Sequence, residues 1–315
     1  MLKRTIEVSG WGYHLAGQGK HLKLSKNEAT VGSVPFEDLG VLVLDTAGAT
    51  ITTSALVQTA DQGGITVLCG RDHLPVAMIQ PLRSHSLSTE RLIAQIDLSR
   101  PMRSALWAQI VRSKIRGQAK ALGAGHASEQ RLLRLADQVQ PADRGHGEAQ
   151  AARVYWRQIF AEYIDDFRRD RNKPGPNALL NYGYAVMRAS MARALCAAGL
   201  QPALGLQHHN RGNHFCLADD FLEPFRPLVD LSVRALLRQG KFELNPDSKR
   251  QLLETLTASI TVCGEISPAS VAMQKLAYSY AEILAQESSR DEQPGTKRRP
   301  NAMARAKLLR LPWLD

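Results

Sequence analysis

The character of the chain changes after Pro81, and this change constrains the fold more than any other feature. Before it, short segments of β-branched or alternating apolar residues are separated by Gly, Asn and Asp, which is typical of strands joined by turns. From about residue 87 to residue 286, apolar residues recur at helical spacing and strand patterns are few. The sequence therefore predicts an α+β protein, in which a small N-terminal β-rich domain precedes a larger all-α domain.

Turn residues and helix-start signals divide the two parts into elements. One short helix is expected at 53–62, with Thr or Ser at its N-cap. Asn-Pro-Asp at 245–247 and Ser-Pro at 267–268 precede two helical runs. The expected strands are 4–9, 21–25, 40–45, 65–69 and 75–79. The expected longer helices are 88–97, 101–122, 127–138, 146–169, 177–199, 215–238, 247–262 and 268–286.

The predicted domain boundaries follow from these elements. The β domain spans 1–84, the helical domain spans 85–288, and 289–315 forms a basic tail. The tail after Glu287 holds seven Lys or Arg, three acidic residues and three prolines, and a short basic helix near 302–310 is an option. Because chain ends of this composition are usually solvated, the tail is expected to be mobile or peripheral rather than a dedicated DNA-binding arm.

The net charge and the distribution of apolar residues limit the classes of partner that the chain is expected to bind. The chain has 40 Lys and Arg against 30 Asp and Glu, a formal net charge of +10, which favours a polyanion. No apolar run reaches transmembrane length, the N-terminus lacks a signal-peptide pattern, and the helices do not read as membrane-surface helices. Nucleic acid is thus the expected partner, no membrane is expected, and the protein is expected to be cytoplasmic. The four cysteines form no C-x-x-C pair, which disfavours a zinc ribbon.

Histidines and carboxylates crowd into residues 205–230. On a helix over 215–238, Asp220 and Glu223 would share a face, and Arg226 lies one further turn along. An imidazole with carboxylates suits a divalent metal. The alternative is an ion pair within the helix and a structural histidine. The histidines next to this helix are His208 and His209, which end the run Gly-Leu-Gln-His-His.

Two other helix starts carry polar residues whose role is either structural or functional. Glu148 opens an alanine-rich helix, where a carboxylate also complements the helix dipole. Asn177 is a good N-cap, and Asn181 and Tyr184 could share one face of its helix. A structural hydrogen-bond network explains these residues as well as substrate contacts do. Spacing alone does not decide between the two.

Four motifs in order resemble one family. NALLNYGYA at 177–185, GLQPALGLQHH at 199–209 and FCLADDFLEPFRPLVD at 215–230, together with the earlier Glu148, resemble the CRISPR adaptation integrase. This is the universal CRISPR-associated endonuclease that inserts new spacers, in the form found in type II loci. Residues 35–70 resemble its β domain, and only the tail past about 288 is not covered.

The resemblance implies a site and a chemistry. Its catalytic metal ligands fall on Glu148, His208 and Glu223, the last being Asp in some members. The implied cofactor is Mg²⁺ or Mn²⁺, which would support attack of a DNA 3′-hydroxyl on a phosphodiester. With water as the nucleophile, the same site would hydrolyse DNA. The residues implied to lie near the metal are Asp220, Tyr182, Asn181 and Arg226.

The resemblance also implies an assembly. It is a homodimer formed through the β domains, and two dimers are bridged by a small second CRISPR-associated protein. The assembly would act on donor duplex and CRISPR repeat DNA, with other type II locus proteins as further candidate partners. Strands 40–45 and 65–69 are too apolar to face water on both sides and need cover from the helical domain or a partner. Basic residues crowd the helix 101–122 as candidate DNA contacts: Arg112, Arg116 and Lys120, with Arg103 and Lys114.

Two other functions stay open. A metal-dependent nuclease acting alone on branched DNA would use the same residues, and it would release free 5′-phosphate ends instead of joined DNA. A non-catalytic DNA-binding scaffold would bind no metal, and its DNA binding would be unchanged by Glu148→Ala.

Overall fold

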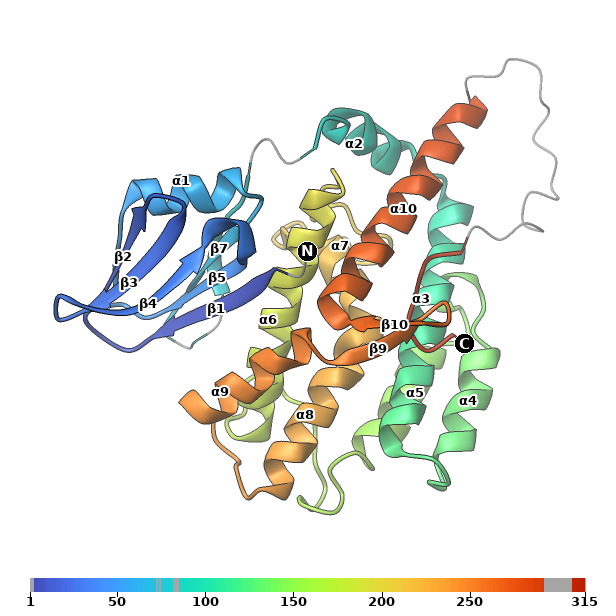
Figure 1. The fold of residues 1–315 in the computed structure, drawn as a ribbon. Coiled ribbons are helices and arrows are strands. Elements are labelled where there is room, and N and C mark those ends of the chain that lie inside the picture. Colours follow the sequence, from blue (N-terminus) through green and yellow to red (C-terminus); the bar gives the residue numbers. More distant parts are fainter. Residues whose placement is uncertain (1–2, 72, 74, 82–84, 292–307, 315) are drawn as a thin grey trace.

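The chain folds into an N-terminal β-sheet region and a largely helical C-terminal region (Figure 1), which confirms the α+β class. The computed structural model describes residues 3–71, 73, 75–81, 85–291 and 308–314. Helix α6, Pro176–Ala197, lies at the junction, with the β-sheet region on one side of it and other helices on the other (Figure 1).

The β-sheet region contains two four-stranded sheets. One has the order β1-β5-β7-β8, with β1, β5 and β7 parallel and β8 antiparallel to β7. The other has the order β4-β3-β2-β6, built on two antiparallel hairpin pairings. The strands are β1 Arg4–Ser9, β2 Tyr13–Gln18, β3 His21–Lys26, β4 Ala29–Pro35, β5 Leu39–Asp45, β6 Thr50–Ile51, β7 Ile65–Cys69 and β8 Pro75–Ile79; η1 Phe36–Asp38 and α1 Thr53–Asp61 complete the region.

The apolar strands β5 and β7 are covered on both faces, as their sequences require. Leu42 and Leu44 of β5 pack with residues of the second sheet, including Leu15 and Leu22. On the opposite face, β5 and β7 pack on Ala189 of α6. Of the two sources of cover that the sequence left open, the helical part or a partner, the helical part covers this face, and the second sheet covers the other. Helix α1 begins at the expected place, where the Thr52 hydroxyl accepts from the backbone N–H of Ala55 at 3.2 Å.

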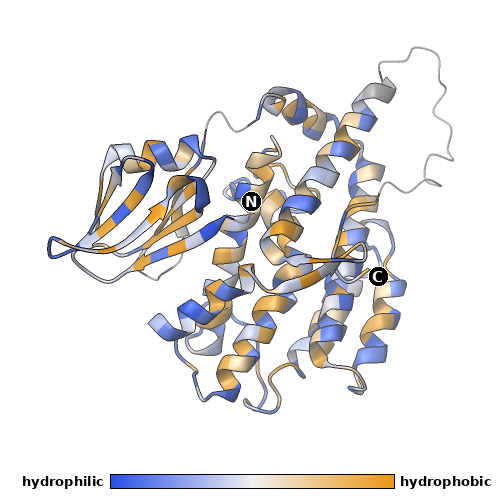
Figure 2. Ribbon diagram, in the orientation of Figure 1, coloured by the Kyte–Doolittle hydropathy of each residue, from blue (hydrophilic) through white to orange (hydrophobic). Residues whose placement is uncertain are grey.

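The helical region surrounds one large apolar core. Apolar and polar residues are interspersed along its helices (Figure 2), as expected for helices that bury one side. None of the helices in the described part of the chain combines the length and apolar character that a membrane crossing requires. The helices are α2 Ser88–Asp97, α3 Arg100–Leu122, α4 Glu129–Asp137, α5 Gly147–Trp156, α6, α7 Cys216–Leu222, α8 Arg226–Arg238, α9 Pro246–Leu253 and α10 Ala269–Asp291, with 3₁₀ turns η2 Pro141–Asp143, η3 Glu223–Phe225 and η4 Glu254–Leu256.

Two predicted helices are shorter than expected. The helix predicted over 146–169 ends at Trp156, and turns follow it. These turns bring the rings of Phe160 and Phe167 to 4.9 Å, whereas seven residues of straight helix would separate them by about 10 Å along the axis. The helix predicted over 215–238 is interrupted by η3, because Pro224 lacks an N–H and its ring clashes with the preceding turn.

Several strands were missed by the sequence patterns. The helix predicted over 247–262 is wrong at its end, where β9 Ser259–Val262 pairs with β10 Glu265–Pro268. The hairpin turn places both Cys263 and Gly264 at positive φ, and the β-branched residues before it were the available signal. The helical region is therefore not all-α. Strands β2, β4 and β6 of the N-terminal region were also not predicted.

The end of the predicted mobile tail belongs to the core. Leu309 and Leu311 are each 2% exposed and join the core cluster of the helical region. The expectation of a mobile or peripheral tail is therefore wrong for residues 308–314, because their apolar side chains are covered by distant helices. Helix α10 also continues to Asp291, past the predicted boundary at 288. Most of the optional helix near 302–310 lies outside the described residues, and 308–310 are not helical.

Candidate functional site

Glu148 is held at the start of α5 by a local cap. The Asp143 carboxylate accepts from the backbone N–H groups of Gly147, at 2.8 Å, and Glu148, at 3.1 Å. These contacts satisfy two N–H groups that a helix start leaves without partners. The cap fixes the first turn of α5, and with it the backbone of Glu148.

Glu223 stands where the proline break interrupts the helix. It ends α7 and begins η3, and its side chain is 7% exposed. Arg226 pairs with it, Nε to Oε1 at 3.0 Å, as the sequence spacing predicted. Asp220, expected on the same face, contacts the loop that carries His208, and the charges of Asp220 and Glu223 both raise the pKa of His208.

Lys114 of α3 joins the two glutamates. Its ammonium lies 2.6 Å from Glu148 Oε1 and 2.6 Å from Glu223 Oε2. The Glu223 Oε2 atom is buried, and this ammonium is the cation that it faces. The sequence placed Lys114 among the candidate DNA contacts, and nothing in its spacing indicated this position.

His208 is oriented by a buried carboxylate. Asp220 is completely buried, and its Oδ1 lies 2.5 Å from His208 Nδ1. Its other oxygen accepts from the backbone N–H groups of Leu206 and Gln207, at 2.6 and 3.0 Å. Gly205 makes this loop possible, since a Cβ there would collide with the His208 carbonyl oxygen and lie 3.0 Å from Asp220 Oδ2.

Glu148 and His208 line one cleft of about 580 Å³, together with His209, His146 and Trp107. The His208 and Trp107 rings lie nearly perpendicular to each other, with 5.9 Å between centroids. Across the described ranges, however, no three His, Cys, Asp or Glu side chains are placed to share one metal ion. The three predicted ligands thus lie in one neighbourhood, and a lysine ammonium occupies the position between two of them.

Charges in this cluster are mutually stabilised. Burial by itself would raise the pKa of Glu223, but Arg226 and Lys114 outweigh burial and lower this pKa to about 2. Burial opposes the charge on Lys114 as well, yet Glu223 and Glu148 raise its pKa above the usual value. The hydrogen bond to Asp220 raises the pKa of His208. At neutral pH, Glu223 is ionised and faces two cations.

The NYGY motif serves two faces of α6. Asn181 accepts from Arg169 Nη2 at 2.6 Å and donates to the Arg171 carbonyl at 2.8 Å, which is a structural network. Tyr182 lies at the β-sheet region, where its hydroxyl donates to Glu7 of β1. Tyr184, two residues on and therefore on the opposite face, has its ring 4.5 Å from the Arg226 guanidinium. The aromatic residue beside the glutamate cluster is Tyr184, where the resemblance implied Tyr182.

The basic residues of α3 have partners inside the molecule. Arg112 donates to the Val139 carbonyl at 2.7 Å, and Arg116 pairs with Asp137 at 2.9 Å. Lys120 lies over the Trp313 ring, 5.4 Å from its centroid. Arg103 donates to carbonyls at the end of α2. These residues therefore do not form the free basic face that the sequence suggested, and DNA contact by them stays a prediction.

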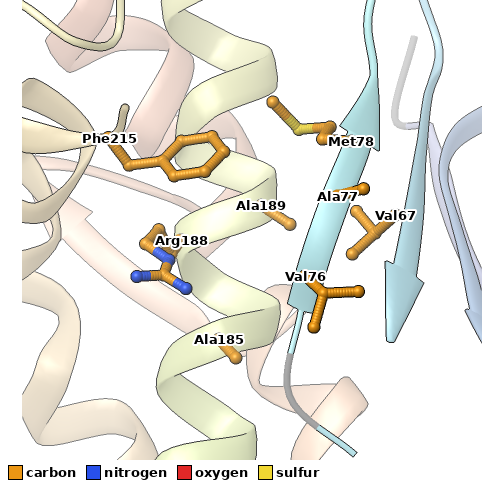
Figure 3. A pocket seen from close by; sticks show the side chains of 8 residues that line it. All are labelled: Val67, Val76, Ala77, Met78, Ala185, Arg188, Ala189 and Phe215. Atoms are coloured by element: carbon orange, nitrogen blue, oxygen red, sulfur yellow. The ribbon is translucent and has the colours of Figure 1, made fainter. Parts of the chain in front are cut away.

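A second pocket, of about 50 Å³, lies between β7, β8 and α6 (Figure 3). Arg188 and Phe215 line it from the helical side, and Val67, Val76 and Met78 line it from the strands. It is small and mostly apolar, and its lining contains no carboxylate or imidazole. The cleft beside Glu148 and His208 is the better candidate for DNA chemistry.

Comparisons with known proteins agree with the arrangement of motifs. The family model described as "CRISPR associated protein Cas1" matches residues 6–259. The CRISPR-associated endonuclease Cas1 of Neisseria meningitidis serogroup C (strain 8013) is 37% identical over 284 residues, which cover 89% of this chain and 91% of that protein.

Two solved structures share the fold. A casposase bound to integration product has a TM-score of 0.70 at 20% identity, over 91% of each chain. A Cas6-RT-Cas1–Cas2 complex has a TM-score of 0.73 at 17% identity, over 90% of this chain and 35% of that one. The family model covers most of the chain and the Neisseria relative exceeds 30% identity, so this chain belongs to the Cas1 family, the CRISPR-associated endonucleases of CRISPR adaptation.

Proposed function

We propose that this chain is a metal-dependent integrase of the type II kind. It joins the 3′-hydroxyl ends of a short donor duplex to repeat DNA in the CRISPR array by transesterification. The observation that carries the proposal is the convergence of Glu148 and Glu223, from different helices, on one cation, the Lys114 ammonium. His208 lines the same cleft as Glu148.

The residues of the cluster fit a divalent ion. Glu223 Oε2 is buried and faces the Lys114 ammonium at 2.6 Å, so a divalent ion in place of that ammonium would meet the same carboxylate oxygens of Glu148 and Glu223. His208 uses Nδ1 toward Asp220, which leaves Nε2 for a metal, the arrangement typical of ligating histidines. Two carboxylates and one imidazole suit Mg²⁺ or Mn²⁺. Glu148, His208 and Glu223 would hold this ion.

When bound, the metal would polarise the scissile phosphate and favour deprotonation of the attacking hydroxyl. The chain's own residues prepare the site. Asp220 fixes the His208 ring, which must be neutral to ligate a metal, so metal and proton compete for this histidine. Arg226 holds the Glu223 carboxylate in place and keeps it ionised through their 3.0 Å ion pair.

The proposed assembly is a homodimer formed through the β-sheet regions, with two dimers bridged by the small second CRISPR-associated protein. Trp11 and Val31 of the β-sheet region are 73% and 55% exposed, which supports an interface there. The net charge of +10 supports binding of donor and repeat DNA through their phosphates. The fold shared with proteins titled as an integration-product complex and a Cas1–Cas2 complex supports the same proposal.

The test is a strand-transfer assay with a supercoiled repeat-containing plasmid, a short donor duplex, the bridging protein and Mn²⁺. His208→Ala and Glu223→Gln are each expected to lower joined product by at least about 100-fold, because each removes a ligand. Duplex binding is expected to persist, since it is mostly phosphate neutralisation. His214→Ala, an exposed histidine of the same loop, is the matched control and is expected to join DNA normally.

Each outcome bears on one part of the proposal. Near wild-type joining by His208→Ala would remove His208 from the ligand set. Cleavage with free 5′-phosphate ends and no joined product would favour a nuclease acting alone. A wild-type protein that neither binds Mn²⁺ nor cuts or joins DNA would favour the non-catalytic scaffold.

A further inference from the structure

The last described residues of the chain form a segment, 308–314, that is built into the helical region. The backbone N–H of Leu309 donates to Gln109 Oε1 of α3, and that of Arg310 donates to Ser279 Oγ of α10, both at 3.0 Å. Pro312 is bridged to Val262 of β9. The segment is therefore held by three elements that are distant in the sequence.

Trp313 connects this segment to the backbone beside Glu223. Its indole Nε1–H donates to the carbonyl oxygen of Pro224 at 2.7 Å. Pro224 directly follows Glu223 in η3, the break on which the direction of the Glu223 side chain depends. A buried backbone carbonyl needs a donor, and in the short η3 turn this indole supplies one.

The segment also contacts α3 beside Lys114. The Ser113 hydroxyl donates to the Pro312 carbonyl at 2.5 Å. Gly117, one turn further along α3, leaves room for the indole: a Cβ there would lie 2.7 Å from Trp313 Nε1 and 2.8 Å from its Cδ1. The segment thus links α3, which carries Lys114, to η3, which carries Glu223.

The ring contacts of Trp313 hold its backbone in an unfavourable conformation. Its φ of 64° is in the left-handed region, which is sterically unfavourable for a residue with a side chain. The indole hydrogen bond, the fit over Gly117 and the Lys120 ammonium above the ring hold it there. A segment that merely covered the core would need none of these directed contacts.

We propose that Trp313 is a positioning residue of the active site, which fixes Glu223 through the Pro224 carbonyl, and that 308–314 is a built-in support of the metal site. The inference rests on the proposed function. It gives the C-terminal segment a role in the chemistry, whereas the sequence suggested a solvated end.

The test compares full-length Trp313→Phe with wild type. Phe keeps most of the ring and removes only the indole N–H. Mn²⁺ affinity, measured by electron paramagnetic resonance of the free ion, is expected to fall about ten-fold, as when a group that orients a metal ligand is lost. The kcat of strand transfer is expected to fall by a similar factor at limiting Mn²⁺ and to recover at high Mn²⁺, while KM for DNA stays unchanged.

The control is Leu308→Ala in the same segment, because the Leu308 side chain is 66% exposed and the substitution removes little buried surface. It is expected to match wild type in Mn²⁺ affinity and joining. If Trp313→Phe does not fold, Ser113→Ala takes its place, because it removes only the hydroxyl donated to Pro312, and it is expected to weaken Mn²⁺ binding about three-fold.

The outcomes separate the two proposals. If wild type binds Mn²⁺ and joins DNA, and folded Trp313→Phe does so with the same Mn²⁺ affinity and kcat, Trp313 has no positioning role. A lower melting temperature with unchanged Mn²⁺ affinity would likewise make its role structural only. If wild type itself shows neither metal binding nor joining, the proposed function fails and the role of Trp313 falls with it.

Discussion

At the scale of single residues, Lys114 decides the charge balance of the site. Its ammonium is a cation that lies between Glu148 and Glu223. Its side chain is only 12% exposed, and that of Glu223 only 7%. Removing the ammonium leaves Glu148 without this cation and leaves Glu223 with Arg226, and an uncompensated charge in such a group costs more than the pair itself contributes.

Lys114→Met is therefore expected to destabilise the metal-free protein by about 3 kcal/mol. Mn²⁺ is expected to stabilise the variant more than wild type, because the ion meets two carboxylates and displaces no ammonium. Denaturant unfolding in EDTA and in Mn²⁺ measures both effects. Lys173→Met, at an exposed loop position, is the control. Equal stability of Lys114→Met and wild type in EDTA, with equal gains from Mn²⁺, would contradict this account.

At the scale of elements, Asp230 joins three helices. This carboxylate of α8 is buried and accepts from the hydroxyls of Tyr155 of α5, at 2.8 Å, and Tyr184 of α6. Burial raises the pKa of Asp230 to about 6, even though both tyrosine hydrogen bonds lower it. The native protein therefore holds a proton on Asp230 between about pH 4 and 6 that the unfolded chain has released.

The direction in which stability changes with pH follows from this bound proton. Because the native state binds more protons in that window, the contribution of Asp230 to stability falls as pH rises from about 4 through about 6, by about 3 kcal/mol. Asp230→Asn does not titrate. The free energy of unfolding of Asp230→Asn minus that of wild type is thus expected to increase by about 3 kcal/mol between pH 4 and 7.

Urea unfolding at several pH values measures this difference, in which the titration of all other groups cancels. Asp166→Asn, at a carboxylate that is 75% exposed, is the control and is expected to show no such shift. A difference between Asp230→Asn and wild type that stays constant with pH would show that Asp230 is ionised throughout the range.

At the scale of the whole molecule, a buried polar cluster holds the two regions together. Lys249 of α9 pairs with Asp45 at the end of β5 and lies 3.9 Å from Glu7 Oε1 of β1. His73 Nδ1 also contacts Asp45, at 2.8 Å, and Tyr182 donates to Glu7. The side chains of Lys249, Glu7 and Asp45 are each at most 7% exposed. Tyr182, which the resemblance implied to lie near the metal, has its hydroxyl in this cluster.

Lys249→Met is expected to destabilise the protein by about 3–5 kcal/mol, because it leaves two buried carboxylates without their cation. Adding Asp45→Asn to Lys249→Met is expected to recover part of that loss, since one of those charges is then gone. Denaturant unfolding of wild type, both single variants and the double variant gives the coupling free energy between Lys249 and Asp45. Additive effects, or a Lys249→Met protein within 1 kcal/mol of wild type, would mean that the cluster does not connect the regions energetically.

The sequence by itself determined the class and order of the two regions, because strand and helix periodicities are local properties. Runs such as residues 40–45 required cover on both faces, and a Thr or Ser cap for the helix that begins near residue 53 was readable from a few neighbouring residues. The motif residues Glu148, His208 and Glu223 were identified by resemblance, together with the Glu223–Arg226 pair that helical spacing predicts. Where local signals were weak or mixed, at β2, β4 and the β9–β10 hairpin, the prediction failed.

Only the tertiary structure decided which side chains meet. Lys114 reaches Glu148 and Glu223 because α3 packs against η3 and α5, and no spacing along the chain encodes that contact. Tyr182 and Tyr184 have different partners because they lie on different faces of α6: Tyr182 contacts Glu7 of the β-sheet region, and Tyr184 contacts Arg226. Trp313 fits over Gly117 because α3 and the chain end approach closely there. Contacts between residues far apart in sequence depend on how whole elements pack, which local patterns do not specify.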